Sequence, residues 1–205
     1  MKRYGFTLLE VMITVTVLTL VVGAIFALSS ALAQSTQIQE SKVTTSDDVR
    51  TAMLFLEREL RQASIGSINW ASLPADRISY RAATDIDGNG TAVDASGFLE
   101  LGPVCTISRD MTDLNGDGLT VTQLIWTDGT SARVIANGLA PNEDVNNNGV
   151  LDPGEDRNAN GRLERGIWFA PANPGLQITV DTQRATNARR LQVVSHLVEV
   201  IIPRN

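Results

Sequence analysis

The sequence predicts an α+β protein in which one long N-terminal helix packs on an antiparallel β-sheet head. Three observations lead to this fold class. An apolar run begins close to the N-terminus, and a helical spacing of apolar residues continues beyond it with no proline before Pro74. Short segments rich in β-branched and aromatic residues, separated by turn residues, occupy the rest of the chain.

The first element is the uncharged run Val11–Leu28, which follows a short basic head containing Lys2 and Arg3. With its flanks, this run is long enough for a membrane span of about 20 residues. The two basic residues would keep the N-terminus in the cytoplasm and send the remainder outward. Glu10 stands just inside the apolar segment, where an unpaired carboxylate costs roughly 2.5 kcal/mol or more. Since the run supplies no basic partner, Glu10 is a candidate functional residue.

The segment Lys2-Arg3-Tyr4-Gly5 before Phe6-Thr7-Leu8-Leu9-Glu10-Val11-Met12 resembles the processing site of type IV prepilins and type II secretion pseudopilins. The resemblance implies that prepilin peptidase cleaves after Gly5 and that the new terminus, Phe6, is N-methylated. It also implies that Glu10 pairs with the Phe6 amine of a neighbouring pilin or pseudopilin subunit. The chain would therefore wait in the inner membrane with a periplasmic head before joining a pilus or pseudopilus.

Two other interpretations of the same segment stay open. Ala31-Leu32-Ala33 matches a signal-peptidase site, which would discard residues 1–33 and release an exported head. The apolar run is longer than the roughly 7–15 residues of a signal peptide, and Glu10 interrupts its start. The third interpretation is a membrane anchor that is never cut.

The second element is an amphipathic continuation of the span. One apolar stripe recurs at spacings of three and four residues, at Val49, Met53, Leu56, Leu60 and Ala63. A single helix from about Thr7 to Ser64 would be about 85 Å long. Its segment Leu56–Ala63 resembles the corresponding helix of J-type pseudopilins and PilW-like minor pilins, which implies a low-copy place at the filament tip. The predicted division is a leader at 1–5, a transmembrane helix at 6–30, its amphipathic continuation at 31–64 and a head at 65–205.

The head is predicted to be β-rich, with the apolar stripe of the helix facing its sheet. Cys105 is the single cysteine, so no intramolecular disulfide can tie the loops together. The predicted strands are Arg77–Arg81, Phe98–Leu101, Leu119–Thr127, Ala132–Ala136, Gly166–Phe169, Leu176–Val180 and Leu191–Ile202.

An acidic loop in the head matches the calcium-loop pattern D-x-[DN]-x-[DN]-G-x₅-E from Asp144 to Glu155. Hard oxygen ligands at this spacing suit Ca²⁺. The glycine at position 6 permits the sharp turn, and the glutamate at position 12 closes the site with both oxygens. The predicted ligands are Asp144, Asn146, Asn148, the Val150 carbonyl, Asp152 and Glu155.

A second copy follows at a repeat of twelve residues, but its twelfth position is Ile167, so the closing carboxylate is missing from the pattern and the site either binds more weakly or requires a ligand from elsewhere. Its predicted ligands are Asp156, Asn158, Asn160, the Arg162 carbonyl and Glu164. Two weaker candidates keep only the front half of the pattern and lack the glutamate: Asp85, Asp87 and Asn89 in one, and Asp113, Asn115 and Asp117 in the other.

Solvated turns are the alternative interpretation of these loops, because Asn-Gly and Asp-Gly are strong turn formers. No helix pair of an EF-hand flanks them, so we expect any calcium to stabilise the head and not to act as a signal.

Composition and motifs exclude several classes of function. A formal charge of −6 without a basic patch argues against a nucleic-acid partner. His196 is the only histidine, and no nucleophile arrangement or phosphate-binding glycine loop occurs, so an enzyme is not predicted. The three tryptophans are scattered, and core packing is their expected role. The alternative to a filament subunit is an exported calcium-dependent binding or adhesion module.

Overall fold

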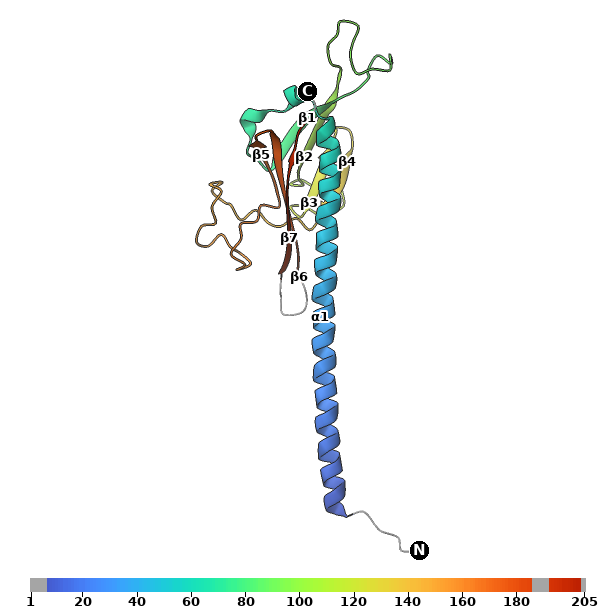
Figure 1. Cartoon of the computed structure of the whole chain (residues 1–205), viewed down its shortest axis with the longest axis vertical. Helices are drawn as coiled ribbons and strands as arrows, with labels where there is room; N and C mark the ends of the chain where they lie inside the picture. The colour runs from blue at the N-terminus through green and yellow to red at the C-terminus, as the bar shows by residue number, and fades with distance from the viewer. Residues whose placement is uncertain (1–6, 186–191, 204–205) are drawn as a thin grey trace.

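The computed structural model describes residues 7–185 and 192–203, and it places a β-rich head beside one end of a long helix (Figure 1). Helix α1 runs from Leu8 to Gln62, close to the predicted Thr7–Ser64. At 1.5 Å per residue its 55 residues span about 80 Å. The Thr7 side chain caps it by accepting the N–H of Glu10 at 3.3 Å.

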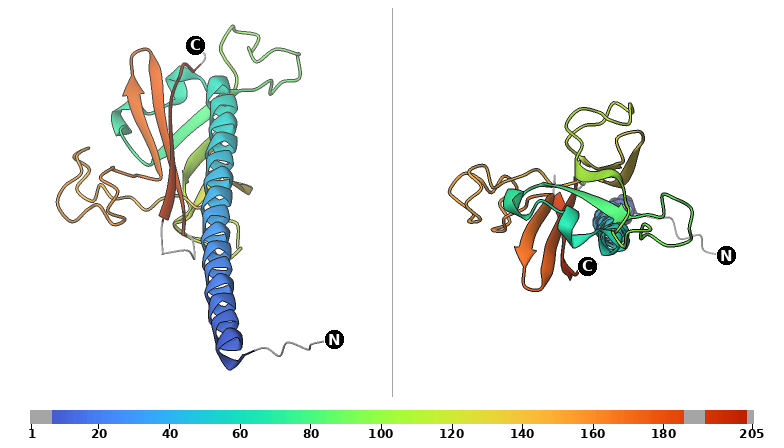
Figure 2. Two further views of the ribbon diagram at one scale, coloured as in Figure 1. Left: turned by 60° about the horizontal axis from the view of Figure 1, so that its bottom comes forward. Right: turned by 90° about the horizontal axis from the view of Figure 1, so that it is seen from above.

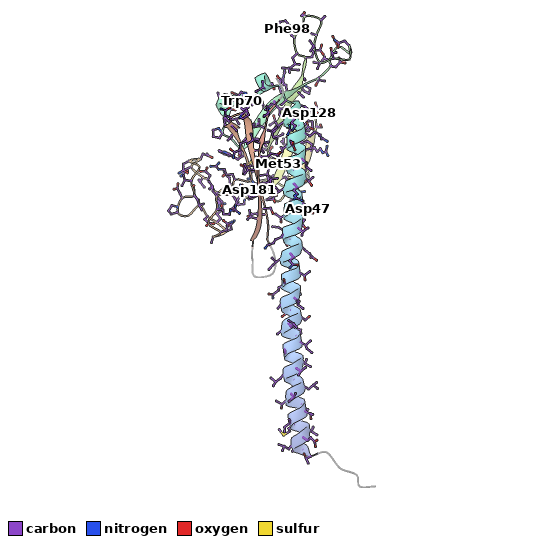
Figure 3. All side chains as sticks on the ribbon, viewed as in Figure 1. Asp47, Met53, Trp70, Phe98, Asp128 and Asp181 are labelled. Atoms are coloured by element: carbon purple, nitrogen blue, oxygen red, sulfur yellow. The ribbon has the colours of Figure 1, made fainter. Side chains whose placement is uncertain are left out.

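The head covers only the C-terminal part of α1, and the N-terminal part projects away from it (Figure 3). Apolar side chains of the projecting part are exposed, including Leu8 at 81% and Phe26 at 76%. Within the head, the predicted stripe is buried, which confirms that this face packs on the strands. The buried helix residues are Thr45, Val49, Ala52, Met53, Leu56 and Leu60.

The strands form two antiparallel sheets where the sequence predicted one. Strands β1 (Arg77–Ala83), β2 (Leu101–Arg109), β3 (Gln123–Thr127) and β4 (Ala132–Asn137) pair in chain order. Strands β5 (Ile167–Ala172), β6 (Gly175–Ala185) and β7 (Gln192–Ile201) form the second sheet. The long acidic connection between β4 and β5 separates the two meanders, and two short 3₁₀ turns, Ile65–Ser67 and Trp70–Ser72, follow the helix.

Several strand predictions were wrong in their bounds: β5 and β6 continue to Ala172 and Ala185, beyond the predicted ends at Phe169 and Val180, and two other strands begin later than predicted. The predicted strand Phe98–Leu101 is the loop before β2, which begins only at Leu101. Gly102 and Pro103 read as strand breakers, but they lie where the β1–β2 register shifts, and a proline without an N–H is tolerated at a bulge. The predicted strand Leu119–Thr127 begins four residues late, at Gln123, because Val121 adopts a left-handed backbone conformation with φ 58°.

Both sheets and the helix share one core. Apolar side chains of α1 meet those of both meanders, and short backbone bridges such as Ala75 with Phe169 and Leu139 with Thr182 join the sheets. Cys105 is free and buried in this core. The largest fully buried side chains are Tyr80, Phe169, Leu56, Leu60, Ile107, Leu124, Ile125, Leu139, Ile167, Leu176, Ile178 and Ile201.

A buried arginine joins separate parts of the head by hydrogen bonds, in a chain whose single cysteine allows no internal disulfide. The Arg109 guanidinium donates hydrogen bonds to the carbonyls of Val121, Ala140 (2.7 Å) and Arg165 (3.0 Å), which belong to the β2–β3 connection and to the two ends of the β4–β5 connection. Only 7% of Arg109 is exposed, and burial lowers its pKa. Gly166, with φ 72°, leaves the space that this guanidinium fills, since a Cβ there would collide with it and with the Ala140 carbonyl.

We expect Arg109→Met to lower the free energy of unfolding by about 3 kcal/mol, because one buried and two partly buried carbonyls would lose their donor. Urea denaturation of the full chain in detergent, followed by tryptophan fluorescence, measures this change. Arg77→Met on the exposed face of β1 is the matched control and should cost less than about 0.5 kcal/mol. An equal loss for both variants would contradict the role assigned to Arg109.

Candidate functional site

The N-terminal part of α1 presents Glu10 on an exposed helix surface. Gly5 and Phe6 lie outside the described residues, so the pairing of Glu10 with the Phe6 amine stays a prediction. Within residues 7–185 and 192–203 the Glu10 carboxylate has no ion-pair partner. The helix is long and apolar enough, by length and composition, to cross a membrane.

The hydroxyl groups in this apolar segment are satisfied within the helix. Thr14 donates to the carbonyl of Glu10 at 2.5 Å, and Thr16 and Thr19 each donate to the carbonyl one turn back at 2.8 Å. A hydroxyl bonded to its own backbone enters an apolar environment at low cost. Glu10 is therefore the one polar side chain of the span whose charge calls for a partner from another molecule.

The head carries four acidic loops that start at Asp85, Asp113, Asp144 and Asp156, and all four have the same internal hydrogen bonds. The first aspartate accepts the N–H groups of positions 5 and 6 with its two oxygens. In the Asp144 loop these distances are 3.0 and 3.1 Å, and in the Asp156 loop they are 3.1 and 2.8 Å. In the Asp85 loop they are 3.1 and 2.8 Å, and in the Asp113 loop 2.9 and 3.0 Å.

The four loops also share an unusual backbone. Positions 4 and 6 have positive φ in every loop, which is why glycine occupies position 6 throughout. Position 4 is Gly88, Gly116, Asn147 and Ala159, with φ from 55° to 76°. The weaker front-half candidates thus fold in the same way as the complete pattern. Figure 2 shows that the connection with the Asp144 and Asp156 loops projects to one side of the head and the segment with the Asp85 loop to another.

The complete loop assembles as the pattern predicts. Glu155 at position 12 returns to the start of the loop, where its two oxygens accept the N–H groups of Val145 at 3.0 Å and Asp152 at 2.9 Å. The amide nitrogens of Asn146 and Asn148 both donate to Asp152 at 2.7 Å. These hydrogen bonds join the two ends of the loop, and the role of its side chains and of the Val150 carbonyl as calcium ligands stays a prediction.

The second loop has a closing carboxylate after all, and it comes from outside the pattern. Glu143 accepts the N–H of Arg157, at position 2, at 2.9 Å, as Glu155 does for Val145. Asn158 and Asn160 donate to Glu164 at 3.0 and 2.6 Å, as their counterparts do to Asp152. Position 12 itself is Ile167, and the carboxylate comes from Glu143, which precedes the loop and which a pattern counted forward from the first aspartate does not include.

Glu143 and Glu164 form a buried acidic pair in this second loop. They are 1% and 2% exposed. Burial and the neighbouring Glu164 carboxylate raise the pKa of Glu143 to about 7. Two carboxylates in such a place need a proton or a cation between them.

The two front-half loops also have closing carboxylates that sequence reasoning missed. Glu100 accepts the N–H of Ile86, at position 2 of the Asp85 loop, at 2.5 Å. The carboxylates of Asp85, Asp87 and Glu100 offer oxygen atoms within 4.8 Å of one another. Asp110 accepts the N–H of Leu114, at position 2 of the Asp113 loop, at 3.2 Å. No spacing rule marks these residues, since they lie on the flanking chain at different separations.

Among the described residues, only Asp85, Asp87 and Glu100 bring three carboxylate oxygens within 4.8 Å of one another, although every loop with its closing residue contains three carboxylates. Arg165 offsets one of them, because its Nη2 lies 2.5 Å from an oxygen of Asp144 and its guanidinium stacks on Trp168. Oxygen-only donor sets with excess negative charge fit a hard divalent cation such as Ca²⁺.

The remaining chemical candidates have structural partners. His196 on β7 contacts the buried Asp181, which also accepts the N–H of Arg165 at 2.9 Å. Trp70 donates to the Ile65 carbonyl and Trp126 to the Tyr80 hydroxyl, at 3.1 and 3.0 Å. These tryptophans pack in or against the core, as predicted, and do not form one aromatic platform.

Comparison with known proteins bears on the N-terminal segment. Residues 1–26 match the family model described as the prokaryotic N-terminal methylation motif, which is the type IV pilin signature. Neither the curated proteins nor the solved structures gave a match. The chain thus carries the signature of a type IV pilin-like precursor, which implies cleavage by prepilin peptidase and assembly with other pilin subunits. A structural subunit fits this signature, and the apolar helix fits a membrane-anchored pilin.

Ala159 occupies position 4 of its loop, where the backbone has a positive φ that is unfavourable for alanine. We expect Ala159→Gly to raise the free energy of unfolding by roughly 0.5 kcal/mol. A left-handed alanine costs about 1–2 kcal/mol, and the extra freedom of glycine in the unfolded chain offsets part of the gain. The control Ala132→Gly in β4, where no positive φ is needed, should lower stability by about 0.5–1 kcal/mol. Changes of the same sign in urea denaturation would contradict the strain at Ala159.

Proposed function

We propose that this pilin-like precursor is a minor pilin or pseudopilin, a non-enzymatic subunit assembled into a type IV pilus or type II secretion pseudopilus. The observation that carries the proposal is the division of α1 into two halves. The methylation motif leads directly into an apolar half whose side chains are exposed, and the head covers only the half from Thr45 onward.

The exposed apolar part of α1 must be buried against another molecule, because none of the described residues of this chain packs on it. Exposed apolar side chains such as Leu18, Leu20 and Ile25 each lose roughly 1.5–3 kcal/mol in water relative to full burial. Lipid covers them while the precursor waits in the inner membrane as a single-pass protein with its head in the periplasm. Equivalent helices of neighbouring subunits cover them in the filament, through head-to-tail contacts that do not close.

The pairing of Glu10 with a processed N-terminus gives this assembly its register. Cleavage after Gly5 creates a free amine on Phe6, and methylation keeps its positive charge. A carboxylate in an apolar bundle is stable only beside such a charge. A neighbouring subunit is therefore accepted where its amine meets Glu10 and rejected where the carboxylate stays unpaired.

The helix segment Leu56–Ala63 within the head bears on the place of the subunit in the filament. The similarity of Leu56–Ala63 to J-type pseudopilins and PilW-like minor pilins supports a low-copy position at the tip. The buried face of this segment packs on the strands, and Glu57 pairs with Arg61 at 2.6 Å on the other face.

Calcium is the second part of the proposal, and its role is structural. The connection between β4 and β5 is long and acidic, and we place one ion in the Asp144 loop and one in the Asp156 loop. Glu155 and Glu143 support this assignment, because each closes its loop in the same way. The ions replace repulsion among carboxylates with coordination and hold the connection in one conformation.

We expect Glu10→Leu to reduce incorporation into filaments by at least about tenfold, which corresponds to 1.4 kcal/mol of lost pairing. Sheared filaments and membranes are separated, and the subunit is quantified in each. The variant should still insert and fold, because leucine is less costly than glutamate in a membrane.

Glu40→Leu provides the matched control, since Glu40 is exposed on the same helix beyond the apolar run. Intact mass shows in all variants whether residues 1–5 are lost and one methyl group is gained. Normal incorporation of correctly processed Glu10→Leu would disprove the pairing, and loss of residues 1–33 would disprove the filament subunit.

Calcium should raise the melting temperature of the chelator-treated full chain in detergent. An ion at one hundred times its Kd adds about 2.7 kcal/mol per site to the free energy of unfolding. Calorimetric titration should show that Glu155→Gln and Glu143→Gln each remove one bound equivalent, and that Glu40→Gln removes none. Identical melting curves in calcium and in chelator would exclude the calcium sites.

A further inference from the structure

The β2–β3 connection contains three buried oxygen atoms that receive no hydrogen bond. Among the described residues, Asp110 Oδ2, Asn115 Oδ1 and Gln123 Oε1 are inaccessible to solvent and have no donor. Asp110 is 0% exposed and Gln123 is 2% exposed. Each buried polar atom without a partner costs about 1–3 kcal/mol, and a carboxylate oxygen costs more. The Asp110 oxygen carries negative charge and calls for a cation or a donor, and the two neutral amide oxygens, one on the loop and one at the start of β3, can accept from a donor or bind a cation.

The position of Asp110 identifies the kind of group. Its other oxygen, Oδ1, accepts the N–H groups of Thr112 and Leu114 at 3.1 and 3.2 Å. Leu114 is position 2 of the Asp113 loop, so Asp110 stands where Glu155 stands in the complete pattern. The unpartnered Oδ2 is therefore the oxygen that closes a metal site in a loop of this type.

The backbone holds Asp110 rigidly in this place. Its N–H donates to the Gln123 carbonyl at 2.9 Å, and its carbonyl accepts the Val121 N–H at 2.6 Å. Both ends of the loop are thus joined where β2 ends and β3 begins. Pre-positioned ligands of this kind lower the entropy cost of binding an ion.

The two amide side chains are oriented by Asp117. Asn115 and Gln123 each donate an N–H to Asp117 Oδ2 at 2.8 Å. Turning either amide over would place its carbonyl oxygen against the carboxylate, so the hydrogen bonds determine which atom is the free oxygen. The unpartnered oxygens of both amides are therefore real acceptors.

No basic side chain of the described residues supplies the missing charge. Asp110 takes part in no ion pair, and the neighbouring Arg109 donates its hydrogen bonds to backbone carbonyls. We propose that the Asp113 loop holds a third calcium ion, bound by Asp110, Asp113, Asn115 and Asp117, with the Gln123 oxygen completing the set. This site adds to the calcium part of the proposed function but rests on its own observation.

The ion would lock the β2–β3 connection beside the buried Arg109. Val121 links the two features, because its carbonyl accepts from Arg109 and its N–H donates to Asp110. Calcium bound here would stabilise the connection between the two central strands of the four-stranded sheet, separately from the long acidic connection between β4 and β5.

Calcium titration of the chelator-treated full chain in detergent tests the site. Calorimetry should show one bound equivalent that remains in the double variant Glu155→Gln with Glu143→Gln. Asp110→Asn, which retains Oδ1, should remove that equivalent from both backgrounds. Asp128→Asn is the matched control, because Asp128 also accepts two backbone N–H groups and lies outside the four loops.

A second variant guards against loss of folding in Asp110→Asn. Asn115→Ala removes one unpartnered oxygen from a half-buried side chain and should weaken the same equivalent by at least about tenfold, the effect typical of a disturbed metal site. Wild-type binding in both Asp110→Asn and Asn115→Ala would overturn the inference while leaving the other two sites intact. If calcium binding decreased only in Glu155→Gln and Glu143→Gln, the proposed function would be supported and the third ion would be rejected.

Discussion

An apolar helix surface that the chain leaves uncovered is the constraint on which the rest of this protein depends. The helix continues without interruption from the span into the head, so the two parts cannot move independently. The exposed half is stable only in lipid or among other helices. Its one charged side chain, Glu10, then restricts which neighbours are acceptable. Membrane residence and filament assembly are two solutions to the same burial problem.

The head solves a different problem, which is how to order long polar connections without a disulfide. Arg109 provides one solution, because a single buried guanidinium reaches a carbonyl of the β2–β3 connection and carbonyls at both ends of the β4–β5 connection. Its charge has no carboxylate partner within hydrogen-bonding distance among the described residues and is spread over peptide dipoles. The space for it exists only because Gly166 lacks a side chain.

The acidic loops are the second way in which polar connections are ordered, and their backbone geometry explains which residues occupy their fixed positions. An aspartate that accepts two N–H groups of its own loop sets a turn with positive φ at positions 4 and 6. The same turn gathers carboxylates that repel one another. Local hydrogen bonding thus shapes each loop, and a cation would remove the electrostatic cost of that shape.

The sequence by itself determined the features that depend on short-range periodicity. These are the single helix, the stripe from Val49 to Ala63 that faces the strands, most strand positions and the front half of each acidic loop. Strand bounds failed where local signals misled, at Gly102-Pro103, which a bulge accommodates, and at Val121, whose backbone is left-handed.

Only the tertiary structure decided how separate segments meet. It divided the strands between two sheets, and it brought Glu143, Glu100 and Asp110 to the second position of loops whose own patterns lack a closing carboxylate. The physical reason is that a hydrogen bond or a metal site requires proximity in space. A flanking chain can supply that proximity from any sequence separation, whereas a motif describes only ligands that follow one another along the chain.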